Sequence, residues 1–277
     1  MIKDIILKLE TDLSRDRSLN YAISVAETFG AHVTAMASCD PISFPQYPIP
    51  DMPESVIANI RAEKEREARA AIARFEEAAK GRNLSFDHEL ITHRLPSSAE
   101  VFAVKARRTD LSIIQQNENE DDDNGAIIET VLFDSGRPIL IVPYIQKDRL
   151  NLDHVVCCWD GSSTAARAVN DALPLLRRAK NADILIIANE KTEDSRHQAS
   201  GEGIVKHLAR HGINVRLKMQ QAPDASVASA ILTYIGEYGS DLAIMGGHGH
   251  SRLRDFILGG VTRGILTSMT VPVFMSH

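Results

Sequence analysis

Apolar residues in this chain form short uninterrupted runs, and each run is followed by a segment whose apolar residues recur at helical spacing. In the second half the runs lie at 155–159, 184–188, 215–219, 242–245 and 271–275, with helices predicted at 165–179, 201–211, 226–238 and 261–269. Such runs are typical of strands that are covered on both faces in a parallel sheet. The alternation predicts an α/β fold with right-handed crossovers, in which an open doubly wound sheet carries helices on both faces.

The first half repeats this order. Strands are predicted at 4–9, 32–37, from Ser85, at 110–114 and at 137–141, and helices at 17–29, at 54–81 and from Ala99. Segment 110–114 parallels 241–245, and 137–141 parallels 271–275, in spacing as well as order. We therefore expect two tandem five-stranded domains, 1–148 and 152–277, joined near 146–151. The alternative is a chance likeness between unrelated α/β segments, because all buried strands are apolar.

A glycine-rich loop follows the fourth run of the second half. Its glycines, together with those that open the last helix, are Gly246, Gly247, Gly249, Gly259 and Gly260. Glycine lets the backbone approach an anion closely, and a helix N-terminus offers unpaired N–H groups, so the loop predicts a phosphate site at the carboxyl edge of the sheet. Neither a dinucleotide fingerprint nor a P-loop is present, because Arg252 replaces the third glycine and no G-x-x-x-x-G-K-[ST] occurs. Close helix packing is the alternative role of Gly259 and Gly260.

This glycine spacing, with Asp160 at the end of the first strand, resembles the universal stress protein family, and the resemblance extends over essentially the whole chain as a tandem pair. It implies an adenine nucleotide alpha hydrolase-like fold that binds ATP, with or without Mg²⁺. It also implies a nucleoside pocket lined by Cys158 and Asp160, an adenine wall at Ala188, and phosphates held by Met245, Gly246, Gly249, Gly259, Gly260 and Val261.

One residue departs from the binding form of that family, which has Ser or Thr directly after the last motif glycine. Gly260 stands there, so a hydroxyl contact to phosphate is missing, and such a hydrogen bond is worth roughly 1.5 to 3 kcal/mol. Asp160 has the alternative role of a turn or helix-cap residue. Basic side chains near the loop would help to neutralise phosphate; the basic and histidine residues are His248, His250, Arg252, Arg254 and Arg263. No metal site is predicted, because no carboxylate or thiol with ligand spacing accompanies the histidines.

The matching loop of the first half has lost its glycines. Gln115 replaces Gly246, Glu118 replaces Gly249, and Gly125 matches Gly259. The carboxylates of 118–123 would repel a triphosphate, because unit charges ~4 Å apart interact by about 1 to 4 kcal/mol. We expect no nucleotide there; a divalent-cation loop is the alternative to a solvated one, although the spacing is not that of an EF-hand.

Two further features belong to the first half alone. The proline-rich stretch 41–53 carries Phe44, Tyr47, Ile49 and Met52, which either cover the edge of the core or form a contact surface. The helix after it is dense in both charge signs, which is typical of a solvated face, with a partner-binding helix as the alternative.

Charge and cysteine content limit the choice of partners. A net charge of -6 provides no concentrated basic face for nucleic acid. The cysteines Cys39, Cys157 and Cys158 are too few for a disulfide framework. No signal peptide is recognised, and no apolar run approaches the ~18 residues of a membrane span. We expect a cytoplasmic protein that binds neither nucleic acid nor membranes.

These observations favour a stress-response binding or regulatory protein that holds ATP or a related adenine nucleotide in 152–277, with the first half as a structural or interaction domain. The resemblance implies that the halves pair through their last strands, and it leaves a homodimer open. No Ser-His-Asp order, paired carboxylates or P-loop lysine is recognised, so slow ATP hydrolysis is the most that is expected. The alternatives are a nucleotide-free scaffold or small-ligand carrier in which both sites have decayed, and an adenylating enzyme.

Overall fold

A computed structural model describes residues 1–12, 16–39, 53–92, 96–118, 124–147, 149–188, 195–222, 225–247 and 258–277. The first half contains β1 (Asp4–Lys8), α1 (Ser18–Phe29), β2 (His32–Ser38), α2 (Glu54–Lys80), β3 (Phe86–Ile91), α3 (Ser98–Ala106), β4 (Leu111–Gln115), α4 (Asn124–Asp134) and β5 (Ile139–Val142). The second half contains β6 (His154–Cys158), α5 (Ser163–Asp171), α6 (Leu173–Leu176), β7 (Asn181–Ala188), α7 (Ser195–Arg210), β8 (Val215–Gln221), α8 (Val227–Tyr238), β9 (Leu242–Gly246), α9 (Gly260–Ser268) and β10 (Val273–Ser276).

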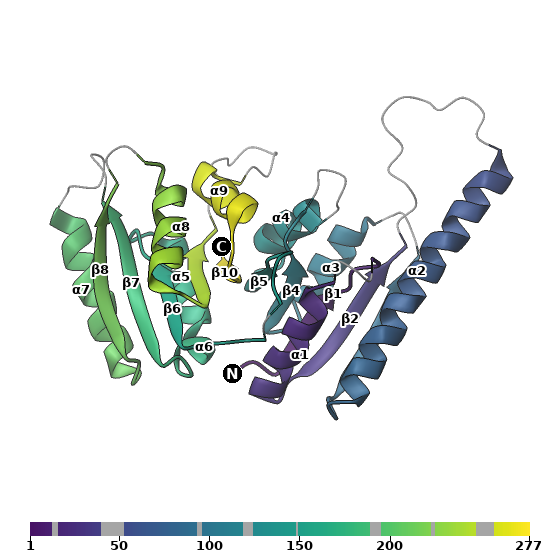
Figure 1. The fold of residues 1–277 in the computed structure, drawn as a ribbon, viewed down its shortest axis with the longest axis horizontal. Helices are drawn as coiled ribbons and strands as arrows, with labels where there is room; N and C mark the ends of the chain where they lie inside the picture. The colour runs from purple at the N-terminus through teal and green to yellow at the C-terminus, as the bar shows by residue number, and fades with distance from the viewer. Residues whose placement is uncertain are drawn as a thin grey trace.

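The strands form a single ten-stranded sheet in the order β3-β2-β1-β4-β5-β10-β9-β6-β7-β8. Neighbouring strands within each half are parallel, and at the centre β5 pairs antiparallel with β10, where Leu140 lies opposite Phe274. The two halves therefore lie side by side, with β5 and β10 in the middle of the molecule (Figure 1). The predicted doubly wound α/β fold is confirmed, and the two five-stranded sheets are continuous with each other.

Matching hydrogen bonds at the start of the first strand support the duplication. In the first half, the Asp110 carboxylate accepts the Asp4 N–H at 3.1 Å, and the Asp110 N–H donates to the Asp4 carbonyl at 2.8 Å. In the second half, Asp241 makes both bonds to His154, each at 2.8 Å. An aspartate directly before the fourth strand thus bonds the start of the first strand in each half. A chance likeness of apolar runs does not explain this agreement.

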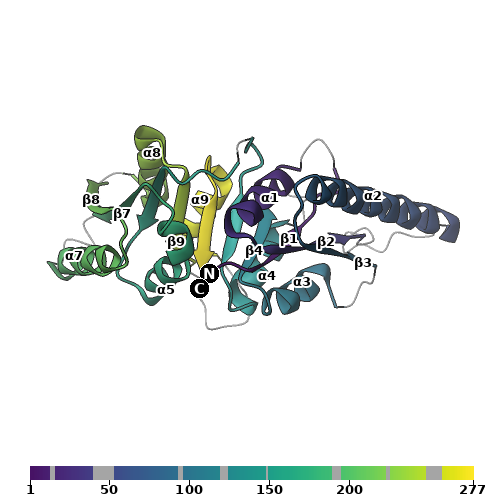
Figure 2. The same ribbon diagram turned by 90° about the horizontal axis from the view of Figure 1, so that it is seen from below.

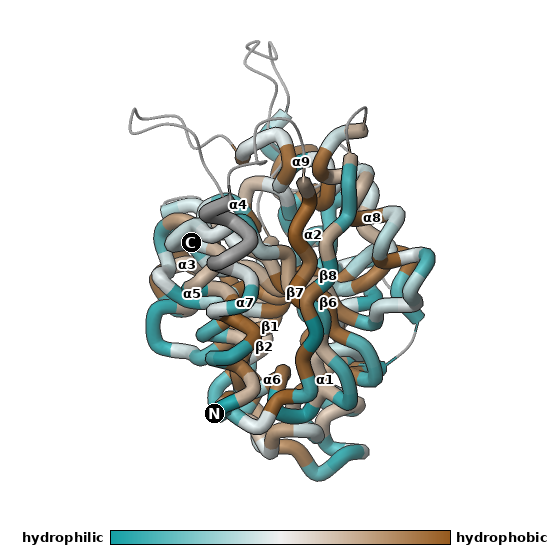
Figure 3. Tube along the Cα trace, turned by 90° about the vertical axis from the view of Figure 1, so that its left-hand side faces the viewer, coloured by the Kyte–Doolittle hydropathy of each residue, from teal (hydrophilic) through white to brown (hydrophobic). Residues whose placement is uncertain are grey.

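The apolar core is divided by the faces of the sheet and not by the halves. On β5, Leu140 and Val142 pack on the face covered by α1, α2, α5, α6 and α7, whereas Ile139 and Ile141 pack on the face covered by α3, α4, α8 and α9. β10 continues both layers, with Phe274 on the first face and Met275 on the second. Among the described residues, each apolar layer therefore contains side chains from both halves. Figure 3 shows hydrophobic stretches running along strands such as β7.

One predicted helix is divided in two. The helix expected at 165–179 is found as α5 and α6, separated at Ala172. Pro174 lies in the first turn of α6, and proline has no N–H to continue the ladder of α5, so the second helix begins afresh there.

The long helix α2 is a solvated helix for much of its length. Its buried residues are confined to its C-terminal half, at Ala68, Ala71, Ile72, Phe75 and Ala79. Charged side chains pair along its surface, for example Glu76 with Lys80 at 2.8 Å. Seen from below, α2 lies along the outer edge of the first half beside β2 and β3 (Figure 2). No helix in the described part of the chain is long and apolar enough to cross a membrane.

The shared core predicts that the halves unfold together. Phe274, which is 1% exposed beside the central strand pair, should cost about 3 to 5 kcal/mol of unfolding free energy when replaced by Ala. Val104→Ala on α3, at a side chain that is 50% exposed, is the control and should change it by about 0.5 kcal/mol or less. Urea unfolding followed by circular dichroism should show one transition shifted to lower denaturant; two transitions, only one of them shifted, would contradict a shared core.

Candidate functional site

The ends of three strands meet at one edge of the second half. Cys158 ends β6, Ala188 ends β7 and Gly246 ends β9. Because β6 lies between β7 and β9 and is parallel to both, these residues share the carboxyl edge of the sheet, where the strand order reverses. The helices α5 and α9 begin near this edge. The geometry therefore places Cys158, Ala188, Met245 and Gly246 at one edge, with Asp160 two residues after β6, whereas Gly249 lies outside the described residues.

Asp160 has a local structural role at this edge. Its carboxylate accepts the Ser162 N–H at 2.9 Å, and the Ser162 hydroxyl accepts the Ala165 N–H at 3.1 Å. Gly161 between them has a φ of 77°, a left-handed conformation that favours glycine. The turn and helix-cap role considered for Asp160 is thus present, and its side chain is nevertheless exposed at the sheet edge. Its contact with a nucleoside stays a prediction.

Two glycines at the end of β9 pack closely against neighbouring helices, and for Gly246 the neighbour is backbone. A Cβ on Gly246 would lie 2.6 Å from the Ala165 nitrogen and 2.7 Å from Thr164 Oγ1, so glycine allows the end of β9 to approach the start of α5. A Cβ on Gly247 would lie 2.6 Å from a methyl group of Leu132 in α4 of the first half. The Gly247 N–H donates to the Ser276 carbonyl at 2.8 Å. This amide is therefore used by the sheet and is not available to an anion.

The start of α9, unlike that of α5, has no side-chain cap. Gly259 is the N-cap, with a φ of -59° and no side-chain cap hydrogen bond, and the first backbone bond of the helix runs from the Arg263 N–H to the Gly259 carbonyl at 2.9 Å. N–H groups of a first helical turn have no acceptor within their own helix. Gly260 and Val261 are exposed, and among the described residues no atom lies within 4 Å of a Cβ built on Gly260. An uncapped, open helix N-terminus of this kind attracts anions.

The remaining predicted residues have apolar surroundings. Met245 is buried with the core residues beneath α8 and α9, so its backbone is the part available at the edge. Burial and the nearby Asp160 charge raise the pKa of the Cys158 thiol to about 12, so the thiol is neutral at physiological pH. Cys39, Cys157 and Cys158 are free cysteines, as expected. The described part of the chain contains no cluster of three or more His, Cys, Asp or Glu that could hold a metal ion.

Comparison with known proteins identifies this half. The model of the universal stress protein family matches residues 151–277, which include β6, β7, β9 and α9. Residues 151–277 therefore form a domain of the universal stress protein family. A universal stress protein of Synechocystis is 24% identical over 152 residues, covering 54% of this chain and about half of that protein, 50%.

Solved structures extend the likeness to the whole fold. A universal stress protein from Archaeoglobus fulgidus has a TM-score of 0.67 at 18% identity, covering 99% of this chain and 97% of that one. A functionally unknown protein from Pseudomonas aeruginosa has a TM-score of 0.65 at 14% identity, with 99% and 92% covered. At these identities the likeness concerns the fold alone.

The equivalent edge of the first half is filled by side chains. The Leu9 N–H donates to the Met36 carbonyl as the Trp159 N–H does to the Leu185 carbonyl, both at 2.8 Å, so Glu10 corresponds to Asp160 of the universal stress protein domain. Glu10 pairs with Lys8 at 3.0 Å, and its carboxylate accepts the Asn124 side-chain amide at 3.0 Å. The Glu10 carboxylate is thus paired with both Lys8 and Asn124.

Two more side chains lie at this edge of the first half. Gln115, which replaces Gly246, accepts the Arg17 N–H at the start of α1 at 2.7 Å. Arg74 reaches in from α2 and donates to the Glu10 carbonyl at 2.9 Å. Arg74 was not predicted from the sequence, because this residue lies far from β1 along the chain and in a helix predicted to be solvated. The acidic run at 119–123, on which the argument against a nucleotide relied, lies outside the described residues.

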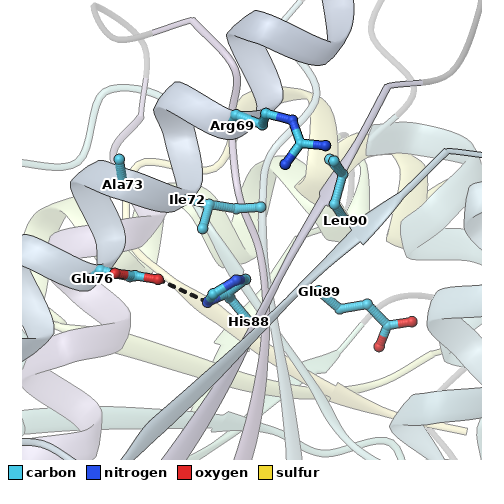
Figure 4. Close-up of a pocket in the computed structure, with 7 residues that line it drawn as sticks. All are labelled: Arg69, Ile72, Ala73, Glu76, His88, Glu89 and Leu90. Atoms are coloured by element: carbon cyan, nitrogen blue, oxygen red, sulfur yellow. Dashed lines mark ion pairs between the residues drawn. The ribbon is translucent and has the colours of Figure 1, made fainter.

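A groove of about 460 Å³ lies on the outer side of the first half, between α2 and the edge strand β3 (Figure 4). Glu76 and His88 form an ion pair across it at 2.9 Å, and Glu89 pairs with Lys105. Its other lining residues are Arg69, Ile72, Ala73 and Leu90. The groove is remote from the carboxyl-edge residues described above and shares none of them.

Asp16 predicts a pH dependence of stability. Burial raises the pKa of Asp16 to about 6. The hydrogen bond from the Leu19 N–H lowers this pKa but only partly offsets the effect of burial. A carboxyl whose folded pKa exceeds its unfolded pKa stabilises the protein below the unfolded pKa and loses that contribution as pH rises through the folded pKa. Between about pH 4 and pH 7 this contribution should fall by roughly 2 to 3 kcal/mol.

Asp16→Asn should remove this part of the pH dependence and be more stable than the wild type at pH 8. Urea unfolding at several pH values measures the difference between the two proteins. Asp134→Asn, at an exposed acidic residue, is the control. A constant difference between wild type and Asp16→Asn across this pH range would show that Asp16 does not titrate as described.

Proposed function

We propose that the second half binds ATP or a related adenine nucleotide, with the phosphates at the start of α9, and that the protein acts as a binding or regulatory protein in a stress response. The observation that carries the proposal is the N-terminus of α9, which begins at two glycines without a side-chain cap and is open at Gly260. Membership of the universal stress protein family through the same segment supports it.

The nucleoside end of the proposed site lies toward β6 and β7. Asp160 is exposed there, and one carboxylate oxygen remains for a ribose hydroxyl after the other has accepted the Ser162 N–H. The small side chain of Ala188, at the end of β7, leaves room for a flat base. A neutral Cys158 places no negative charge beside the nucleoside. These groups recognise a sugar and a base but supply neither a nucleophile nor a general base, which suits binding better than turnover.

The arrangement of the whole chain follows from this proposal. We assign 152–277 to the nucleotide domain and 1–148 to a domain that has given up its own site, because Gln115, Glu10 and Arg74 fill the equivalent edge. A cytoplasmic location suits an adenine nucleotide ligand and the free cysteines. Mg²⁺ would enter with the phosphates of ATP, because no set of protein ligands is present among the described residues.

A nucleotide-free scaffold is the second candidate function. The filled edge of the first half and the glycine at position 260 favour it. Purification under native conditions separates the two candidates. Denatured protein should release an adenine nucleotide detected by absorbance at 260 nm and mass spectrometry; a protein that carries none, and that shows no heat on titration with ATP, would favour the scaffold.

A hydroxyl at position 260 should strengthen binding. Gly260→Ser fits the helix without a clash and adds a donor at the start of α9, so ATP affinity should rise by about 1.5 kcal/mol, roughly tenfold. Gly260→Ala is the matched control, because it adds the Cβ without the hydroxyl. Calorimetric titration measures both variants, and equal affinities for Ser and Ala would exclude a phosphate near this position.

Valine at position 259 should weaken binding. The φ of -59° at Gly259 is accessible to any residue, so Gly259→Val should fold, and its side chain should occupy the volume of the phosphates. We expect at least about a tenfold loss of ATP affinity, with thermal unfolding close to that of the wild type. An unchanged affinity in calorimetry would refute the assignment of the phosphates to α9.

A further inference from the structure

The two outermost strands of the sheet each have one edge without a partner strand. In the strand order β3 and β8 stand at opposite ends, and each pairs with a single neighbour among the described residues. Figure 2 shows them near opposite ends of the molecule. The last strands of the halves, β5 and β10, are already paired with each other. Among the described strands, further pairing is therefore available at β3 and β8.

Every second residue of β3 directs its backbone groups outward. The carbonyls of Ser85 and Ile91 accept N–H groups of the β2 side, from Val33 at 3.1 Å and from Cys39 at 3.0 Å. A parallel ladder uses alternate residues of a strand, so the odd-numbered residues of β3 are bonded to β2. The residues that face outward are Phe86, His88 and Leu90.

The outer edge of β8 has the same property. The Asn214 carbonyl accepts the Ala182 N–H at 2.8 Å, and the Ala222 N–H donates to the Ala188 carbonyl at 3.0 Å, so the even-numbered residues of β8 are bonded to β7. The residues that face outward are Val215, Leu217 and Met219. Both edges thus offer a row of backbone N–H and C=O groups to a further strand.

The charged side chains of the two edges have opposite signs. Asp87 and Glu89 lie on β3, whereas Arg216 and Lys218 lie on β8. Both pairs lie on the sheet face covered by α3, α4, α8 and α9, because the intervening residues pack on the other face with the core beneath α2 and α7. The Asp87 side chain is 79% exposed and that of Arg216 is 58% exposed. One end of the sheet is therefore acidic and the other is basic on the same face.

The two edges are complementary in direction and in register. The halves of the sheet run in opposite directions, so β3 of a second copy shifted along the sheet lies antiparallel to β8. With His88 opposite Leu217, each acidic residue directly faces a basic one, in positions where the side chains of an antiparallel pair are closest. These pairs are Asp87 with Lys218 and Glu89 with Arg216.

The same register also pairs apolar side chains on the other face of the sheet. Phe86 then lies opposite Met219, and Leu90 lies opposite Val215. Met219 is 43% exposed in the single chain, and the second copy would cover it. Cross-strand pairs of apolar side chains and of opposite charges both stabilise a sheet.

Neither edge suits a second copy of itself. Antiparallel pairing of two β3 strands about His88 places Asp87 opposite Glu89, and pairing of two β8 strands about Leu217 places Arg216 opposite Lys218. Like charges directly opposite each other are destabilising. The charges therefore favour β3 with β8 over either closed dimer.

We propose that copies of this chain associate end to end, with β8 of one molecule paired antiparallel to β3 of the next, so that the sheet continues from molecule to molecule. The two contacting surfaces differ, so each assembly keeps one free β3 edge and one free β8 edge and grows beyond two copies. The inference goes beyond the proposed nucleotide site and uses none of its residues.

Sedimentation of the full chain from micromolar to millimolar concentration tests this contact. The mean mass of the wild type should rise with concentration beyond that of two copies. Asp87→Lys and Lys218→Glu each place like charges opposite each other, and each alone should weaken association about tenfold. An equimolar mixture of the two variants should regain the wild-type association, because every contact between unlike variants then joins opposite charges.

Two further variants separate strand pairing from a loss of fold. Met219→Pro removes an outward N–H that makes no bond within the chain, so it should prevent association while circular dichroism and urea unfolding stay close to the wild type. Asp134→Lys reverses an exposed charge on α4, away from both edges, and should associate as the wild type does.

Four results would overturn the proposal. These are a wild type that stays monomeric throughout or stops at two copies, a single charge variant that associates as the wild type does, a mixture that associates no better than either variant alone, and a folded Met219→Pro that still associates. A monomeric wild type would leave these edges to strands of other proteins.

Discussion

The antiparallel pairing of β5 with β10 is the contact on which the rest of the molecule depends. Each half has a parallel sheet whose last strand would otherwise be an exposed apolar edge, and such edges invite unwanted pairing. Joining them places Leu140 opposite Phe274 and extends the apolar layers across the centre of the sheet. Because the central pair is antiparallel, the halves are related as by a twofold axis. Helix α4 of one half is thereby brought against Gly247, directly after β9 of the other.

The carboxyl edges of the two half-sheets are equivalent in position but carry different residues. In the second half Gly246 admits the start of α5, and α9 begins at an open, uncapped turn. In the first half the Gln115 side chain accepts a hydrogen bond from the Arg17 N–H at the start of α1, and Arg74 of α2 donates to the Glu10 carbonyl. These hydrogen bonds occupy the first edge with side chains, although Arg74 Nη1 and Arg17 Nε are buried there without a partner. The same fold thus supports an open edge and a closed one within a single sheet.

The first half nevertheless contacts the second half. Through Leu132 on Gly247 and the Phe133 ring on His277, its helix α4 packs against the residues that follow β9 and β10. This provides a physical reason for a tandem chain to retain a domain without a site of its own. A fused partner can carry a residue that differs from its equivalent, which a symmetric pair of identical chains cannot.

The sequence by itself determined the order of the strands, the likeness of the two halves, and the glycines at the end of β9 and the start of α9, because apolar periodicity and glycine placement are local signals. It did not predict helix α4. It did not determine that α5 and α6 are separate helices, although Pro174 is visible in it, or which acidic residue of 10–12 matches Asp160. Only the tertiary structure decided that Leu132 packs on Gly247 and that Arg74 bonds the Glu10 carbonyl. Both contacts join residues distant in the chain, and the first exists only because the central strands pair antiparallel, which no local pattern encodes.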